Sequence, residues 1–182
     1  MKLKKVYFIV LLFFIVSLNQ YVKSQNNVFK AGAAITNITP NLGVKVVGNF
    51  NSPGVDYIHD EIHVRTLVLT DGNDTLTFSI VDNVGIPREL WDAAKKSATY
   101  LYGIPYKNMM MSADHDHSAP SARGVPSDRY VGYLDEYQRF LVNRIVDGIG
   151  IALKNLELAQ IGWGGVNIPE HVFSRRYIMK EP

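Results

Sequence analysis

The stretch His63-Val-Arg-Thr-Leu-Val-Leu-Thr70, Asp71-Gly-Asn-Asp74, Thr75-Leu-Thr-Phe-Ser-Ile-Val81 contains two runs of strand-forming residues around a turn. Both runs are rich in Val, Leu, Ile and Thr, which favour the pleated surface of a sheet. The acidic, Gly-containing segment between them is typical of a turn that joins two antiparallel strands. We therefore predict a β-hairpin over residues 63–81.

Two helices are predicted downstream of this hairpin. The first begins at Pro87, a residue suited to the first helical turn, and continues to about Leu101 before a stop at Gly103. The second has apolar residues on one face from Leu134 to Leu156, over about six turns. Further strands are expected over residues 28–35, 108–112 and 159–166.

Strands separated by helices predict an α/β fold, a layered mixed sheet with packed helices. No repeat, low-complexity tract or charged block divides residues 25–182, so we expect a single domain there. In such a domain, catalytic groups are expected where strands lead into loops.

The amino terminus has the pattern of a secretory signal peptide. Residues 1–5 are basic, Val6 to Leu18 are almost wholly apolar, and Val22-Lys23-Ser24 offers a cleavage site before Gln25. About 13 apolar residues are too few for a hydrocarbon core that needs roughly 20, although an uncleaved anchor or a buried helix is the alternative. We expect residues 1–24 to be removed and the protein to be secreted or periplasmic.

The charge of the chain argues against a nucleic-acid partner, and its lack of cysteine limits the possible metal ligands. The formal net charge of +2 becomes −2 once the four lysines of residues 1–24 are removed, and no basic cluster remains for nucleic-acid phosphates. The chain contains no cysteine, which excludes disulfides and thiolate metal ligands. A metal ion would therefore need His, carboxylate or Tyr ligands.

The segment Ala113-Asp-His-Asp-His-Ser-Ala-Pro120 is the candidate metal site. His115 and His117 are two residues apart at a predicted strand end, so their side chains should lie on one face. Neutral imidazole is a common zinc ligand, and Asp114 or Asp116 could fix its tautomer by accepting the other ring proton. His59, His63 and His171 could share the pocket.

A His-x-His pattern by itself also occurs on surface strands that bind nothing. Zinc hydrolysis requires at least three protein ligands and a vacant position, and this segment provides at most two. The motif predicts part of a zinc site, which needs further support from the surrounding sequence.

That support comes from a resemblance to the neutral, non-lysosomal ceramidases. Asp114-His-Asp-His-Ser-Ala-Pro120 resembles their Thr-His-Thr-His-Ser-Gly-Pro motif. Four other parts of the chain resemble the family in the same order and spacing: Ala31–Ala34 with Ile38–Pro40, Ile58–Asp60 with Arg65–Leu69, Ser79–Asp82, and Ser174–Tyr177.

The resemblance implies a zinc-dependent amidase, with residues 25–182 as the amino-terminal part of its catalytic domain. By this likeness His115 binds Zn²⁺, His117 is a catalytic residue beside the metal, and Asp82 is a second catalytic candidate. Asp60, Asp114 and Asp116 would lie next to these residues and position them without contacting the metal. For Asp60 and Asp82, capping of strand ends is the alternative role.

Where the family motif has two threonines and a glycine, this chain has Asp114, Asp116 and Ala119. These changes alter the approach of a hydrophobic substrate. The family's remaining ligands, a His, a Glu and a Tyr, are expected beyond Pro182. We therefore expect residues 1–182 to be a fragment, an incomplete domain without catalysis on its own; measurable amidase turnover would contradict this.

The leading hypothesis is cleavage of the amide bond of ceramide-like N-acyl sphingoid lipids, presented by a membrane or micelle. An exported hydrolase acting on another amide or ester is the first alternative, and an exported binding module is the second. A cyclic amidohydrolase barrel is disfavoured, because in that fold His-x-His follows the first strand, whereas here strands and a helix precede it.

Overall fold

The computed structural model describes residues 28–46, 51–120, 122, 134–171, 176 and 178–180. The predicted signal peptide, residues 1–24, lies outside them, as does all of the Ser174–Tyr177 segment except Arg176.

The described chain forms a mixed five-stranded sheet with two helices, which confirms the predicted α/β class. The strand order is β4-β3-β2-β1-β5. β3 and β4 are parallel, and the other neighbouring pairs are antiparallel. The strands are β1 (Lys30–Asn37), β2 (His63–Thr70), β3 (Thr75–Val81), β4 (Met109–Ala113) and β5 (Glu157–Leu158).

The predicted hairpin is confirmed, because β2 and β3 have the expected bounds and pair in register from Val64–Val81 to Thr70–Thr75. The turn is held by Asp71, whose Oδ1 accepts hydrogen bonds from the backbone N–H groups of Asn73 (2.9 Å) and Asp74 (2.8 Å). Gly72 adopts φ 93°, a conformation that glycine reaches without steric cost.

Helices α2 (Arg88–Tyr102) and α3 (Glu136–Lys154) also lie where the sequence predicts them. Pro87 precedes α2, and Gly103 ends it in the left-handed conformation. A capping box begins α3, in which Asp135 and Gln138 each accept a hydrogen bond from the other's backbone N–H. Two short 3₁₀ helices complete the list of elements: η1 (Tyr106–Asn108) and η2 (Pro169–His171).

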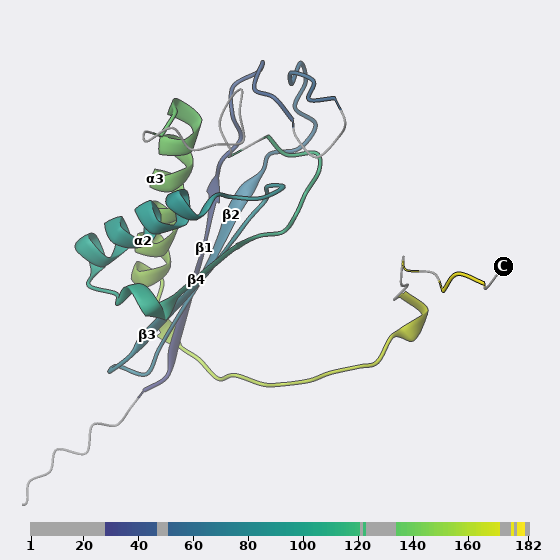
Figure 1. Ribbon diagram of the computed structural model, residues 1–182. Helices are drawn as coiled ribbons and strands as arrows, with labels where there is room; N and C mark the ends of the chain where they lie inside the picture. Colours follow the sequence, from purple (N-terminus) through teal and green to yellow (C-terminus); the bar gives the residue numbers. More distant parts are fainter. Residues whose placement is uncertain are drawn as a thin grey trace, which may run out of the picture.

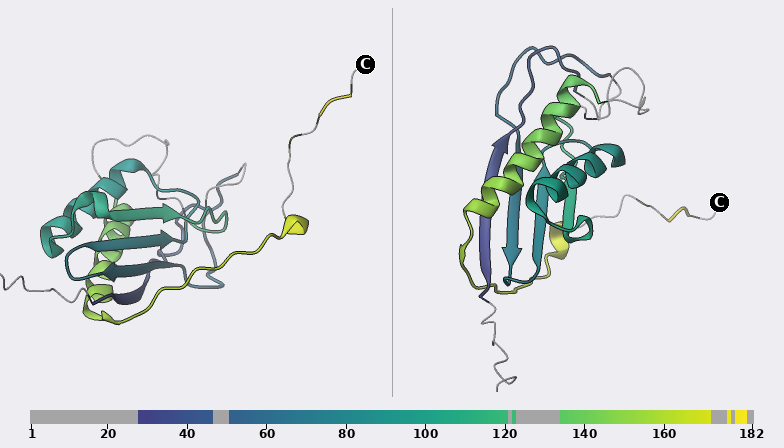
Figure 2. Two further views of the ribbon diagram at one scale, coloured as in Figure 1. Left: turned by 90° about the horizontal axis from the view of Figure 1, so that it is seen from below. Right: turned by 90° about the vertical axis from the view of Figure 1, so that its left-hand side faces the viewer.

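Both helices cover the same face of the sheet (Figure 1; Figure 2, right). Leu141, Ile145 and Ile149 of α3 are fully buried in this layer. Burying each such side chain contributes about 1.5–3 kcal/mol relative to leaving it exposed. This packing fixes β1, β2 and β3, and thereby the ends of the strands.

The other face of the sheet carries large apolar side chains that remain exposed in the described part of the chain. They come from β1, β2, β3 and β4: Ile35, Leu67, Leu76 and Met110. None of the described helices is long and apolar enough to cross a membrane.

The predicted strand over residues 159–166 is wrong. β5 contains only Glu157 and Leu158, which pair with Ala31 and Lys30 at the start of β1. Because the pairing is antiparallel, residues beyond Leu158 need partners that precede β1, and Ala159 finds one when its N–H donates to the carbonyl of Phe29 at 3.1 Å. The chain then leaves the sheet edge and extends away (Figure 1). The predicted bounds of two other strands differ slightly from the observed ones. β1 begins two residues later than expected, and β4 begins one residue later.

Candidate functional site

Parallel pairing of β3 with β4 brings the ends of these two strands to the same edge of the sheet. Val81 and Ala113 are register partners at that edge. The segments that follow remain joined by two hydrogen bonds, from Asp114 N to Val81 O and from His115 N to Asn83 O, both 3.1 Å long. The His-x-His motif therefore lies directly beside residues 82–85.

The two motif histidines converge. Nε2 of His117 lies 3.3 Å from Nε2 of His115, and the rings are 4.9 Å apart in an edge-to-face arrangement. Both side chains are exposed to solvent. The structure thus brings together the two imidazoles that the sequence predicts to lie near each other.

The convergence has a different cause from the one predicted. β4 ends at Ala113, before the motif, so strand alternation does not align the two rings. His115 instead has φ 71° and is the only described residue other than glycine with a positive φ. This left-handed conformation costs about 1–2 kcal/mol for a residue with a Cβ. Such conformations are found where the surrounding contacts hold them in place.

A backbone carbonyl fixes the ring of His115. Its Nδ1 lies 2.7 Å from the carbonyl oxygen of Val84. Because a carbonyl oxygen only accepts hydrogen bonds, Nδ1 carries the proton, and the neutral ring has its lone pair on Nε2. That lone pair is directed into the space shared with His117.

Asp114 and Asp116 do not take the tautomer-fixing role suggested for them. Oδ1 of Asp114 accepts from the N–H groups of Asn83 and Asp116, each at 3.2 Å. Oδ1 of Asp116 accepts from the N–H of Ser118 at 2.7 Å. Short acidic side chains commonly bond to the backbone two residues onward, and here they shape the loop.

Asp82 is largely buried and holds neighbouring strands together. One carboxylate oxygen pairs with the guanidinium of Arg65, and the other accepts from the N–H of His63 at 2.9 Å. These are the contacts of a strand-end cap, the alternative role considered for this residue. Its catalytic role stays a prediction.

The other histidines lie apart from the pair. His59 is exposed and lies 2.7 Å from Asp60, and His63 lies 3.8 Å from Glu61. His171 is in η2, on the carboxyl-terminal segment that leaves the sheet edge. In the part of the chain that the structure describes, no group of three or more His, Asp or Glu side chains could hold a metal ion. The hypothesis of a pocket shared by several histidines is therefore wrong for these residues.

The donor set of the pair nevertheless suits zinc. Two nitrogens bound to one tetrahedral zinc ion at about 2.0–2.1 Å lie about 3.3–3.4 Å apart. The two Nε2 atoms lie 3.3 Å apart, and a carbonyl holds the remote nitrogen of His115 in the way usual for histidine ligands. The pair can supply two ligands, and a hydrolytic site needs at least one more.

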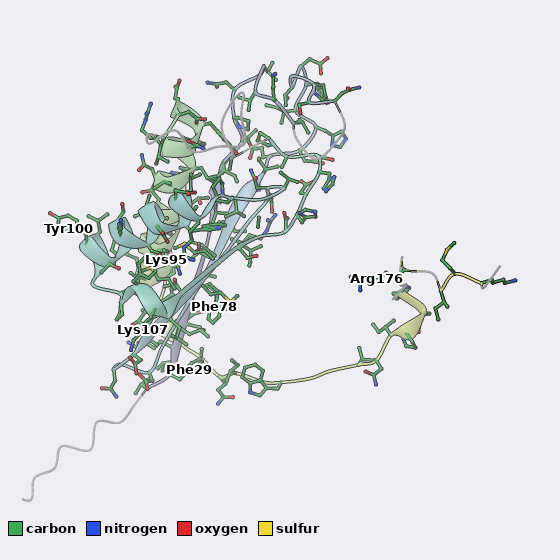
Figure 3. The ribbon with its side chains drawn as sticks, viewed as in Figure 1. Phe29, Phe78, Lys95, Tyr100, Lys107 and Arg176 are labelled. Atoms are coloured by element: carbon green, nitrogen blue, oxygen red, sulfur yellow. The ribbon has the colours of Figure 1, made fainter. Side chains whose placement is uncertain are left out.

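A shallow cavity of about 360 Å³ lies at the opposite end of β3 and β4. Its wall includes Phe78, Lys95 and Lys107, which lie near one another in Figure 3. Lys95 also lies over the ring of Tyr106, 4.7 Å from its centre. This cavity is separate from the histidine pair. Met109, which lines the cavity, is the first residue of β4, whereas the pair lies beyond Ala113, the last residue of that strand.

Sequence reasoning missed two contributors to the site, the carbonyl of Val84 and the buried side chain of Asn83. A carbonyl is present in every residue, so its use leaves no mark on the sequence. Asn83 follows Asp82 at a predicted strand end. Asparagine is common in turns, so its presence there does not indicate a role in the site.

Comparisons with known proteins support the fold. No family model and no curated protein matches this sequence. A solved structure of neutral ceramidase from Pseudomonas aeruginosa matches with a TM-score of 0.62 and 18% identity, over 74% of this chain and 23% of that chain. A structure of ceramidase complexed with C2 matches with a TM-score of 0.59 and 19% identity, over 72% and 22%. The chain thus has a ceramidase-like fold and spans less than a quarter of the length of either structure.

Proposed function

We propose that this chain is part of a secreted, zinc-dependent hydrolase that cleaves the amide bond of ceramide-like N-acyl sphingoid lipids. The observation that carries the proposal is the pair of Nε2 atoms 3.3 Å apart, with Nδ1 of His115 held by a carbonyl. The ceramidase-like fold supports the substrate class.

In this proposal His115 binds zinc through Nε2. The carbonyl of Val84 keeps the proton on Nδ1, so in the neutral ring the nitrogen that faces His117 is available as a ligand. When bound, zinc supplies a water nucleophile at neutral pH and polarises the scissile carbonyl. Further ligands must come from outside the histidine pair.

His117 is close enough to act on whatever His115 binds. Its ring is exposed and meets that of His115 edge to face, which leaves it accessible to a substrate. We assign it the orientation of the substrate or the movement of a proton to or from the reacting group. Asp82 would act indirectly, since its carboxylate already bonds to Arg65 and to the backbone of His63.

A hydrolase of the same fold with another amide or an ester as substrate is the second candidate. The specific observation in its favour is the position of Asp114 and Asp116 on either side of His115. These two residues add negative charge to the loop that carries the histidines, which favours a polar or cationic substrate over an uncharged lipid. Profiling with N-acyl sphingoid bases, other amides and esters separates the two candidates.

The decisive experiment compares zinc content and fatty acid release for the full-length gene product and its His115→Asn variant. Asparagine tolerates the left-handed conformation at this position better than most residues, so the backbone should be retained. His59→Asn is the matched control, because His59 is also exposed and its contacts are with Asp60 and Tyr57, away from the histidine pair. We expect zinc and activity to be lost in His115→Asn and kept in the control. Unchanged zinc in His115→Asn would remove His115 from its role.

A further inference from the structure

Asn83 lies at the centre of the hydrogen bonds that surround the histidine motif. It lies two residues beyond the end of β3 and has no exposed surface. Its backbone N–H donates to Oδ1 of Asp114 (3.2 Å), and its carbonyl accepts from the N–H of His115 (3.1 Å). Both contacts reach the beginning of the motif.

The side chain of Asn83 reaches the end of the same motif. Nδ2 donates to the carbonyl of Pro120 at 2.8 Å, in a buried contact. Oδ1 accepts from the N–H of Gly85 at 3.2 Å, which shapes the segment containing the Val84 carbonyl. One residue therefore fixes both ends of the loop that carries the histidines and the carbonyl that orients His115.

The loop needs such support. His115 and His117 are exposed, whereas Ala119 and Pro120 are buried, so the loop is anchored at its ends and open between them. The left-handed conformation of His115 is held by the bond from its N–H to the Asn83 carbonyl. Without the bond to Pro120, the loop would gain alternative positions in which the two Nε2 atoms no longer face each other.

We infer that Asn83 is a positioning residue that holds the two histidines in metal-binding geometry; this rests on the proposed zinc site. Asparagine suits the position because it supplies an acceptor for Gly85 N and a donor for Pro120 O from one side chain. Aspartate keeps the shape and the acceptor but places a carboxylate oxygen against a carbonyl oxygen. Leucine keeps the volume and loses both bonds.

The test measures the zinc affinity of the full-length gene product by competition with a chromophoric chelator. The variants are Asn83→Asp and, as matched control, Asn155→Asp, because Nδ2 of Asn155 also donates to a backbone carbonyl, that of Ala33 at 3.0 Å. Residues that support metal ligands typically change affinity by about 10–100-fold. We expect a loss of at least about 10-fold for Asn83→Asp and no change for Asn155→Asp.

Thermal unfolding of each variant separates positioning from general destabilisation, because zinc affinity is compared at temperatures where all variants are folded. If Asn83→Asp does not fold, Asn83→Ser provides the same comparison without an added charge. If His115→Asn has lost zinc but a folded Asn83 variant binds zinc with wild-type affinity, Asn83 does not position the histidines and the inference is overturned. Zinc retention in His115→Asn itself overturns the proposed function instead.

Discussion

Gly32 of β1 lies against the backbone of Ala152 in α3 so closely that a Cβ on Gly32 would be 2.1 Å from the Ala152 carbonyl oxygen. The obstacle is backbone in a packed helix, which cannot move aside as the end of a flexible side chain can. This contact sets the distance between the sheet and α3, and it requires glycine.

We predict that Gly32→Ala destabilises the protein by at least about 3 kcal/mol, the upper part of the usual range for overpacking. Denaturant unfolding measures the change. Gly162→Ala is the control, because nothing lies within 4 Å of a Cβ there, and it should change the free energy of unfolding by less than about 0.5 kcal/mol. Equal stability of the two variants would contradict the close approach of β1 and α3.

A second prediction concerns the backbone of His115. His115→Gly and His115→Ala both lose the ring, so their difference in stability reports the left-handed conformation. We expect the glycine variant to be more stable by about 1 kcal/mol, because glycine adopts positive φ without steric cost. The same pair of substitutions at His117, which does not have positive φ, should favour alanine or show no difference. A more stable alanine variant at position 115 would be inconsistent with φ 71°.

A third prediction concerns the pH dependence of stability through Asp92 of α2 and Tyr106 of η1. The Tyr106 hydroxyl donates to Asp92, and this bond, followed by the one from Arg88, lowers the pKa of Asp92 below 3.8. The same bond raises the pKa of Tyr106 above 10.0. The stabilisation by Asp92 is thus present above pH 3.8 and is lost as the pH falls through its lowered pKa, while that by Tyr106 is lost as the pH rises through its raised pKa.

Asp92→Asn should therefore be less stable than the wild type between these two limits, and the difference should disappear in stronger acid. Chemical unfolding at a series of pH values measures it. Tyr106→Phe removes the same hydrogen bond from the other side and should lose stability over the same range. A difference that persists unchanged below the pKa of Asp92 would show that the carboxylate is not its source.

A fourth prediction separates the two roles considered for Asp82. Arg65→Ala leaves the carboxylate of Asp82, only 12% exposed, without its charged partner, and should cost about 1–3 kcal/mol. If Asp82 only joins the strands, Asp82→Asn should lower stability while kcat changes no more than in Arg65→Ala. A fall in kcat that greatly exceeds that of Arg65→Ala would instead support a catalytic role. Unfolding and steady-state kinetics on the full-length gene product measure both.

The sequence predicted the elements whose signals are local. The turn at Asp71, the start of α2 after Pro87 and its end at Gly103 depend on neighbouring residues, so these elements appear at nearly the expected positions. The strand expected over residues 159–166 depended on a distant partner. β1 begins at Lys30, and beyond Leu158 the pairing continues only as one hydrogen bond, from Ala159 N to Phe29 O, which composition alone could not reveal.

The same distinction applies to the candidate site. The proximity of His115 and His117 could be predicted from their spacing, but its cause could not. It depends on a left-handed backbone at His115 and on the carbonyl of Val84, and neither feature is indicated by the type of residue at these positions. A carboxylate near a histidine predicts an acceptor for its second ring proton, whereas Asp114 and Asp116 bond to nearby backbone N–H groups.

The parallel pairing of β4 has a consequence for the order of folding. The β2–β3 hairpin can form from local contacts, whereas β4 can join β3 only after the crossover through α2 has closed. Pulsed hydrogen exchange should therefore show protection in β2 and β3 before Met109–Ala113, and simultaneous protection would contradict this order. The histidine loop follows β4, so the close approach of His115 and His117 should be acquired only at the end of folding and be the first feature lost when the sheet edge opens.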